Sequence, residues 1–206
     1  MLQPNSPTTD LLAMRLREAT RGAHHDIDHH PLVAPLVRPD LTLPQYLRVL
    51  RTMWWVHVPL QALFARQITA LGADFELANR VAWLQADLTH FGLPDALPVE
   101  PWVPPFPGSV AELVGMLYVI EGSTLGGQII SRQLKLRIGV ESGRGATFFN
   151  GWGAETDTHW RKFWAFASSV CPVGQTALAV PAAIRMFEQL RSAFDMALLW
   201  AEPQCN

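Results

Sequence analysis

Two stretches decide how this chain folds: LREATRGAHHDIDHHPL at Leu16 to Leu32, and LYVIEGSTLGGQIISRQL at Leu117 to Leu134. Apolar residues recur in both at the three- and four-residue spacing of a helix. The first stretch offers imidazoles beside arginines, and the second offers glycines that leave the backbone bare. This combination suits a flat, anionic, metal-containing ligand, which needs a nitrogen ligand on one face, small residues against the other and cations at its rim.

The composition predicts one apolar, folded domain over residues 1–206. The chain is 49% hydrophobic and 17% charged, which argues against disorder, and its net charge of -2 gives no general attraction to nucleic acid. The start, MLQPNSPTTD, lacks the features of a secretory signal, and no apolar run approaches membrane-spanning length. Cys171 and Cys205 are too few for a disulfide framework. We therefore expect a cytoplasmic protein with neither a nucleic-acid nor a membrane partner.

Helical periodicity runs through most of the chain. Thr8, Thr9 and Asp10 are N-cap candidates for a first helix that reaches about His29, since Pro31 prevents its continuation. Further helices are expected at Leu43 to Leu71 with a kink at Pro59, Phe75 to Phe91, Ser109 (the cap) to Ile138, Thr156 to Ser169, and Val173 to Trp200. A proline-rich connection at Leu93 to Gly108 and a loop, VESGRGATFFNGWG, separate them. The fold class is all-α, with six or so helices.

The first stretch places Arg17, Arg21, His24 and Asp28 along one helix face, because they are spaced by four, three and four. A neutral imidazole coordinates iron through one ring nitrogen, while a carboxylate one turn away accepts a hydrogen bond from the other nitrogen. Asp28 is placed for that second role beside His24. A chance pairing of His and Asp on an exposed face is the alternative.

The cluster HHDIDHH also permits a bare metal site, since His25 and His29 are one turn apart with Asp26 and Asp28 between them. Di-iron bundles, however, use Glu-x-x-His pairs, and this sequence contains none. We therefore interpret His25, His29 and His30 as solvated residues at a helix end, where a cationic imidazole suits the helix dipole.

The second stretch carries glycines inside a helix. Gly122 and Gly126 share a face and Gly127 follows at once, although each glycine costs about 1 kcal/mol against Ala in a helix interior. Two gains offset such a cost: close approach of another helix, or close approach of the backbone to a planar ligand. The spacing alone leaves both open.

At these residues the chain resembles the heme oxygenase family. LREATRGAH is similar to the family's proximal-histidine helix, YVIEGSTLGGQ to its distal glycine-rich helix, and FFNGWG, THWRKFW and MFEQLRSAFDMALLW to its C-terminal helices. The YVIEGSTLGG form looks most like the bacterial members associated with bacteriophytochromes. The resemblance implies a single-domain heme oxygenase-like fold, with heme between the proximal helix and a kinked distal helix.

The resemblance also implies roles for single residues. His24 would be the axial ligand to heme iron with Asp28 behind it, while Gly122, Gly126 and Gly127 would lie over the opposite heme face and leave a position for dioxygen. Arg17, Arg21, Arg132 and Arg161 would be partners for the heme propionates, with at least one only a solvated surface residue. Tyr118 would reach a propionate or be a core aromatic. Phe149, Trp160, Phe163 and Trp164 would belong to the pocket wall or the core.

Two positions depart from the better-known family members. Ser123 stands where those carry an aspartate that orders water at the bound oxygen, and a hydroxyl anchors water without carrying charge. Ala165 stands where they place an arginine on a propionate. Both departures bear on heme orientation.

The implied function is a heme oxygenase that opens heme to biliverdin and releases carbon monoxide and ferrous iron. Dioxygen would be the co-substrate, and an external donor such as ferredoxin or a ferredoxin reductase would supply electrons, because no GxGxxG follows a strand to bind NAD or flavin. A bacteriophytochrome would be the biliverdin acceptor. The alternatives are a heme-binding or heme-sensing protein without turnover, a thiaminase-like enzyme using Cys171, and a helical partner module.

Overall fold

The computed structural model describes residues 7–93, 100–171 and 173–200. Helices account for most of this part of the chain, and the described residues contain no β-strand. The α-helices are α1 (Pro7–Ala19), α2 (Arg21–Asp28), α3 (Leu43–Ala70), α4 (Arg80–His90), α5 (Val110–Ile138), α6 (Thr147–Asn150), α7 (Thr156–Val170) and α8 (Thr176–Leu198), joined by 3-10 turns η1 (Ala34–Val37), η2 (Gly153–Glu155) and η3 (Val173–Gln175). The all-α prediction is therefore confirmed.

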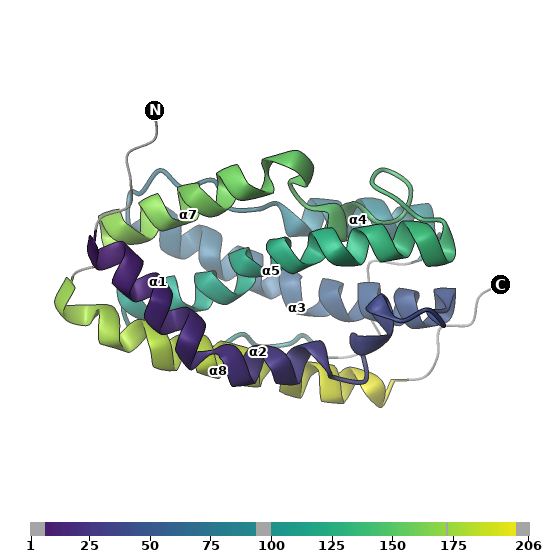
Figure 1. Cartoon of the computed structure of the whole chain (residues 1–206), viewed down its shortest axis with the longest axis horizontal. Coiled ribbons are helices and arrows are strands. Elements are labelled where there is room, and N and C mark those ends of the chain that lie inside the picture. Colours follow the sequence, from purple (N-terminus) through teal and green to yellow (C-terminus); the bar gives the residue numbers. More distant parts are fainter. Residues whose placement is uncertain (1–6, 94–99, 172, 201–206) are drawn as a thin grey trace.

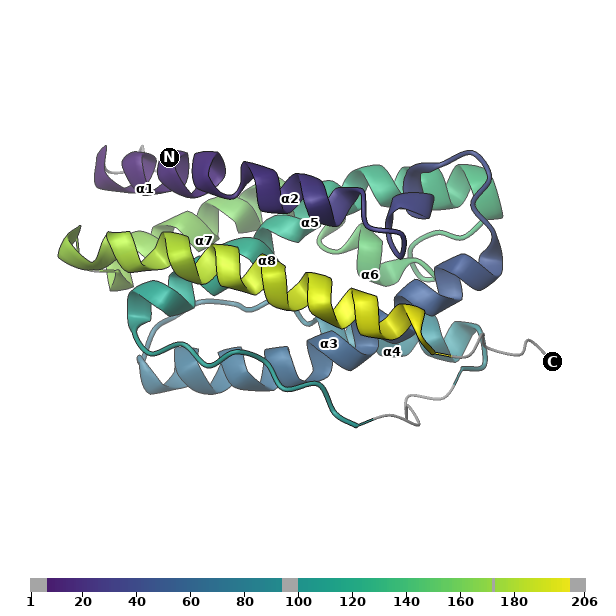
Figure 2. The same cartoon turned by 90° about the horizontal axis from the view of Figure 1, so that it is seen from below.

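Helix α5 is the centre of the fold. It packs against α8, α7, α6, α3 and the turn η1 (Figure 1). Helices α1 and α2 run along α8 (Figures 1 and 2). In Figure 2, α2 and the C-terminal half of α5 both lie along the upper edge of the molecule, whereas Figure 1 separates them, with α2 below and α5 above.

The core is filled by large side chains from all the long helices. Tyr46, Phe64 and Phe163 are fully buried and come from α3 and α7. Where α5 crosses α8, a Cβ at Gly115 would collide with the backbone carbonyl of Ala179. This glycine is explained by close helix-to-helix approach.

Several helix starts agree with the sequence signals. Ser109 caps α5, since its Oγ accepts a hydrogen bond from the backbone N–H of Glu112 at 3.2 Å. Thr42 and Gln45 form a capping box at the start of α3, which carries Pro59 inside as expected. The expectation that Thr8, Thr9 or Asp10 caps the first helix was wrong, because α1 begins at Pro7 and these three residues lie inside it.

Two helix predictions need correction. The first helix is interrupted at Thr20, whose hydroxyl donates to the Leu16 carbonyl at 2.7 Å, and such back-bonding bends helices. The third helix begins at Arg80, because the Asn79 side chain caps it and Phe75 stacks on Phe166 of α7 at 4.6 Å instead of continuing the helix.

The predicted loop and the last helix also differ in detail. The loop contains the short helix α6. The Asp87 carboxylate of α4 stabilises the start of α6, because it accepts hydrogen bonds from the first backbone N–H groups of that helix. The last helix begins at Thr176, after the turn η3, rather than at Val173. The proline-rich connection is irregular where it is described, while residues 94–99 and Cys205 lie outside the described residues.

The expectation that no apolar run approaches spanning length was wrong for α5. This helix is long and apolar enough to cross a membrane by length and composition, but 56% of its most apolar window is buried inside the protein. A core helix of a globular protein meets the same criterion, because many of its apolar side chains pack against neighbouring helices.

Candidate functional site

His24 lies on α2 with its side chain 61% exposed, and its ring meets Phe187 of α8 edge-on at 5.8 Å. The Nδ1 atom of His24 is 2.9 Å from Oδ2 of Asp28, one turn further along the helix. A carboxylate in that position accepts a hydrogen bond from Nδ1–H, and the neutral ring then has its lone pair on Nε2. This is the arrangement that a metal-ligating imidazole requires.

The other imidazoles of the cluster divide into two kinds. His25 and His29 are exposed and stack on each other at 4.0 Å, as expected for solvated residues. His30 was wrongly predicted to be solvated: its side chain is only 4% exposed. Its Nε2 is 3.1 Å from Oδ1 of Asp195 on α8, and its Nδ1 accepts the backbone N–H of Leu32.

His30 therefore fixes the end of α2 against α8. Its ring also packs edge-on against Phe194, at 5.6 Å between ring centroids. Within the described ranges, no group of three or more His, Cys, Asp or Glu side chains is arranged to hold a bare metal ion. The geometry of the cluster thus favours one exposed imidazole ligand over a polynuclear metal site.

The three glycines of α5 have different surroundings. A Cβ at Gly127 would lie 2.7 Å from the carbonyl oxygen of Phe149, so this buried glycine permits α6 to approach. A Cβ at Gly122 would make ordinary contact with Trp160, at 3.4 Å or more. A Cβ at Gly126 would meet nothing within 4 Å. Packing explains Gly127 but leaves the glycine at position 126 unexplained.

The surface around Gly126 is apolar. Its neighbour Leu125 is exposed, and Ile129, three residues along the helix, is 55% exposed. These two exposed apolar side chains leave apolar surface beside the bare glycine that a ligand could contact. They belong to the C-terminal half of α5, which lies along the same edge of the molecule as α2 in Figure 2.

The donor set and the bare backbone fit a heme group. His24 offers a nitrogen whose partner nitrogen is already paired with Asp28, and the glycine at position 126 gives a planar ring room to approach. Exposed apolar atoms of Ile129 would lie against an apolar macrocycle. Cations for the propionates must come from the nearby arginines.

The four predicted propionate partners all have exposed side chains, and none pairs with a carboxylate from the described residues: Arg17, Arg21, Arg132 and Arg161. Two of them make local hydrogen bonds. Nε of Arg132 donates to the Gln128 carbonyl at 3.1 Å, and Arg161 donates to the Thr158 hydroxyl at 3.2 Å. Exposed guanidinium groups of this kind are available to a carboxylate ligand.

The aromatic candidates lie in the core or against it. Tyr118 packs on Trp160 and Trp164, at 5.9 Å in each case, which favours a core aromatic over a propionate partner. Phe163 and Trp164 are buried, as is Phe149, which packs beside α5. These side chains support the helix that carries the glycines.

Ser123, which replaces the family's aspartate, hydrogen bonds within its own helix. Its Oγ–H donates to the Ile120 carbonyl at 2.7 Å. The oxygen retains lone pairs that can accept a hydrogen bond from water, but its proton is committed to the backbone. Ala165 is exposed on α7 and supplies no cation.

Cys171, the candidate for a thiaminase-like reaction, is buried at the end of α7, and burial raises the pKa of its thiol. A nucleophilic cysteine needs a lowered pKa and access to substrate. This geometry disfavours the thiaminase-like alternative.

Sequence reasoning missed a buried ion pair behind the glycines. Arg80 of α4 donates to the Glu121 carboxylate of α5 at 2.7 Å, with exposed fractions of only 4% and 6% for the two side chains. The signal was a single carboxylate inside the apolar run YVIEG, since a buried charge requires a partner. Asp87, also on α4 and fully buried, was missed as well.

Comparisons with known proteins bear on the family and the fold. Residues 10–97 match the family model of heme oxygenase. A heme oxygenase of Xanthomonas campestris pv. campestris (strain 8004) is 41% identical over 97 residues, which make up 45% of this chain and 54% of that protein. The match thus spans about half the length of this curated relative.

A solved structure extends the likeness to almost the whole chain. The NO- and CO-bound heme oxygenase from Neisseria meningitidis matches with a TM-score of 0.72, covering 95% of this chain and 96% of that chain at 20% identity. The chain therefore has the heme oxygenase fold, and the three matches together support the heme oxygenase family. The matched family range includes His24 but ends before α5, so the roles of the glycines are argued from the geometry above.

Proposed function

We propose that this protein is a heme oxygenase, which opens heme to biliverdin with release of carbon monoxide and ferrous iron. The observation that carries the proposal is the contact between His24 and Asp28 at 2.9 Å, and the open surroundings of Gly126 on α5 agree with it. The fold shared with the heme oxygenase from Neisseria meningitidis and the family match over residues 10–97 also support it.

The residues would divide the work of binding between the two helices. Nε2 of His24 would ligate the iron, and Asp28 would hold the imidazole ring in the orientation and tautomer that ligation needs. Bound heme would supply both the iron that activates dioxygen and the porphyrin that is cleaved. Gly126 would allow close approach of α5, and Gly122 would keep the preceding turn free of a side chain, whereas Gly127 admits α6.

Cations on four helices would orient the ligand. Arg17 of α1 and Arg21 of α2 lie near the proximal histidine in sequence, while Arg132 of α5 and Arg161 of α7 follow the glycines. At most three of them would pair with the propionates through charge-assisted hydrogen bonds, and Tyr118 would contribute mainly by packing. With Ser123 as an acceptor, water near the glycines would be held by hydrogen bonding without a negative charge.

We further propose that dioxygen and an external electron donor such as ferredoxin or a ferredoxin reductase complete the reaction, with no bound flavin or NAD. We also propose a cytoplasmic location. Delivery of biliverdin to a bacteriophytochrome is proposed from the resemblance of YVIEGSTLGG to bacterial members of that kind. Deleting the gene without altering the chromophore loading of the phytochrome would refute the last step.

A heme-binding or heme-sensing protein without turnover is the second candidate. The observation in its favour is that the Ser123 proton is donated to the Ile120 carbonyl, so this side chain offers no proton to a bound ligand. The His24 site would be the same in both cases. Only turnover separates the two functions.

The test is to add hemin to the purified protein, record the absorption spectrum, then supply reductant and oxygen with catalase present to remove peroxide. A Soret band that bleaches into biliverdin absorption is the expected result. Hemin that binds but never opens under several reductants would favour the second candidate. Hemin that does not bind specifically would refute both.

The ligand assignment has a matched control in the neighbouring histidine. His24→Ala should shift the Soret band and weaken hemin binding, whereas His25→Ala should leave both unchanged, because His25 is similarly exposed and contacts only the exposed Asp26, at 3.8 Å, and His29, on which it stacks. If the two variants have the same spectra as wild type, His24 is not the ligand.

A further inference from the structure

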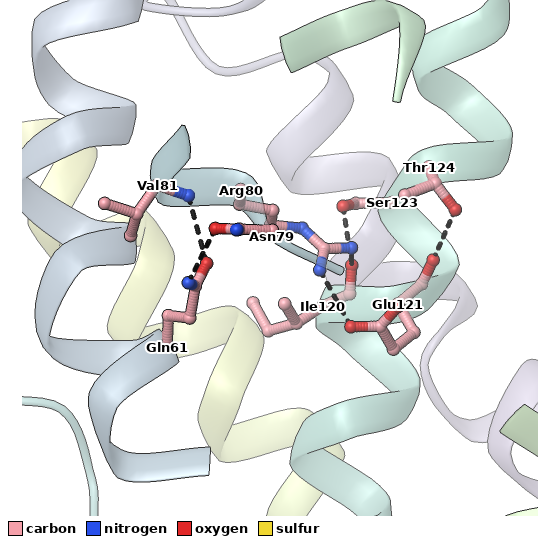
Figure 3. Close-up of polar contacts among 8 residues, drawn as sticks. All are labelled: Gln61, Asn79, Arg80, Val81, Ile120, Glu121, Ser123 and Thr124. Atoms are coloured by element: carbon pink, nitrogen blue, oxygen red, sulfur yellow. Dashed lines mark hydrogen bonds and ion pairs between the residues drawn. The ribbon is translucent and has the colours of Figure 1, made fainter. Parts of the chain in front are cut away.

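Arg80 holds α5 at the turn just before the glycines. Its Nη1 donates to Oε1 of Glu121 at 2.7 Å and its Nη2 donates to the Ile120 carbonyl at 2.6 Å (Figure 3). Both charged side chains are buried. Burying an ion pair adds little net stability, so the consequence of this pair is geometric: it joins one fixed point of α4 to one fixed point of α5.

The turn that Arg80 holds is weakened by its own side chains. Ser123 Oγ donates to the Ile120 carbonyl and Thr124 Oγ1 donates to the Glu121 carbonyl, at 2.7 Å in both cases (Figure 3). Hydroxyls that bond to carbonyls of their own helix compete with its backbone hydrogen bonds and bend it. Since glycines follow directly, this part of α5 would be soft without an external anchor.

Helix α4 is itself anchored to α3. Gln61 of α3 donates to the Asn79 side chain at 3.0 Å and accepts the backbone N–H of Val81 at 3.0 Å (Figure 3). The first turn of α4 therefore has a fixed position, and Arg80 extends from that turn. The position of α5 at Ile120 is thus tied through α4 to the long helix α3.

The second buried charge of α4 acts at the other end of the glycine segment. Asp87 follows Arg80 by seven residues, or two turns, and so lies on the same face of α4. Its carboxylate accepts the backbone N–H groups of Thr147 at 2.7 Å and Phe148 at 2.8 Å, which caps α6. Helix α6 in turn presses the Phe149 carbonyl against Gly127.

A further hydrogen bond fixes α6 to α5. Gln128, next to Gly127, donates through Nε2 to the Asn150 carbonyl at 2.6 Å and to the Thr156 hydroxyl at 3.2 Å. Residues 122–127 are therefore held at both ends by contacts that lead back to α4, directly at Glu121 and through α6 at Gly127.

We propose that Arg80 and Asp87 are positioning residues, which hold the glycine segment of α5 at a fixed place so that its bare face at Gly126 meets the ligand bound by His24. The ligand part of this inference rests on the function proposed above. The other part of the inference does not depend on a ligand: two buried charges on α4 fix both ends of residues 122–127.

The test compares amide hydrogen exchange in the ligand-free protein. In the double variant Arg80→Met/Glu121→Met, which leaves no unpaired buried charge, amides of residues 123–128 should exchange about tenfold faster or more, as expected for losing hydrogen bonds to a charged group. Amides of α8 should keep their wild-type rates. Asp87→Asn should accelerate the same segment from its other end.

A matched control is the exposed ion pair between Arg185 of α8 and Glu112 at the start of α5, at 2.8 Å. Arg185→Met/Glu112→Met also removes an Arg–Glu ion pair in which the glutamate belongs to α5. This variant should leave the amide exchange rates of residues 123–128 unchanged. If the buried double variant does not fold, Arg80→Lys replaces it, because an ammonium cannot make both bonds of the guanidinium fork; about threefold faster exchange is then expected.

Two results would overturn the inference. Wild-type exchange rates at residues 123–128 in both the Arg80 and the Asp87 variants would show that these residues position nothing. An equal acceleration in α8 would show that they only stabilise the whole fold. Because this readout needs no heme, it stands even if the wild-type protein fails to open hemin.

The ligand part has its own readout. In the variants with faster local exchange, the dissociation constant of hemin should rise by about tenfold and the Soret band should shift. If those variants bind hemin with the wild-type spectrum and affinity, Arg80 and Asp87 do not position the glycine segment for the ligand.

Discussion

Two adjacent glycines of α5 provide a sharp test of the site, because the same substitution should have opposite effects on stability. Gly126→Ala and Gly127→Ala both replace a helix-interior glycine, which by itself gains about 1 kcal/mol. At Gly126 the new methyl group meets nothing within 4 Å. At Gly127 it lies 2.7 Å from the Phe149 carbonyl oxygen, a distance that real Cβ contacts do not tolerate.

The magnitudes follow from these contacts. Gly126→Ala should raise the free energy of unfolding by about 1 kcal/mol, which corresponds to about 2–4 °C in Tm for a chain of this size. Gly127→Ala forces α6 away from α5, and such overpacking costs about 1–3 kcal/mol. After the gain in helix propensity, its net effect is a loss of about 1 kcal/mol, so the two variants should differ by about 2 kcal/mol.

The assay combines denaturant unfolding with hemin titration. If a ligand approaches α5 at Gly126, the stabilised variant Gly126→Ala should bind hemin more weakly and with a shifted Soret band. A destabilised Gly126→Ala would refute the open surroundings of this glycine. A stabilised Gly126→Ala with unchanged hemin binding and turnover would refute the ligand as the reason for its bare backbone.

Three other substitutions test the packing, the electrostatics and the proximal pair. Gly115→Ala should lower the free energy of unfolding by about 2 kcal/mol in a urea titration, since its methyl group collides with the Ala179 carbonyl; an unchanged midpoint would contradict this contact. Burial, and secondarily the Arg80 guanidinium, holds the pKa of His57 well below its usual value. Just below about pH 6.5, the His57 imidazole therefore takes up a proton only in the unfolded state. As the pH falls, protonation of His57 should therefore lower the free energy of unfolding by up to about 1.4 kcal/mol per pH unit. The plot of unfolding free energy against pH should be less steep by that amount for His57→Leu between about pH 6 and pH 5, and equal slopes would exclude the effect. Asp28→Asn should weaken hemin binding by about tenfold while thermal stability stays near wild type, because the carboxylate orients His24 from an exposed position; wild-type affinity would exclude this role.

The sequence alone determined most of the helices and predicted the class of site. Apolar spacing, the Ser109 cap and Pro31 are local signals, and local signals act through the backbone of the same few residues. The pairing of His24 with Asp28 was predictable for the same reason, since residues one turn apart on a helix face each other. Resemblance over two motifs supplied the heme oxygenase fold, which the solved structure from Neisseria meningitidis supports.

Only the tertiary structure decided what covers each helix face. Gly126 and Gly127 are neighbours in sequence, yet one is open and the other holds α6. His30 is buried because α8 places Asp195 beside it. Arg80 meets Glu121 across 41 residues of sequence. Helical periodicity gives the direction of a side chain around its own axis but contains no information about the neighbour on that side, and burial, charge pairing and close approach all depend on that neighbour.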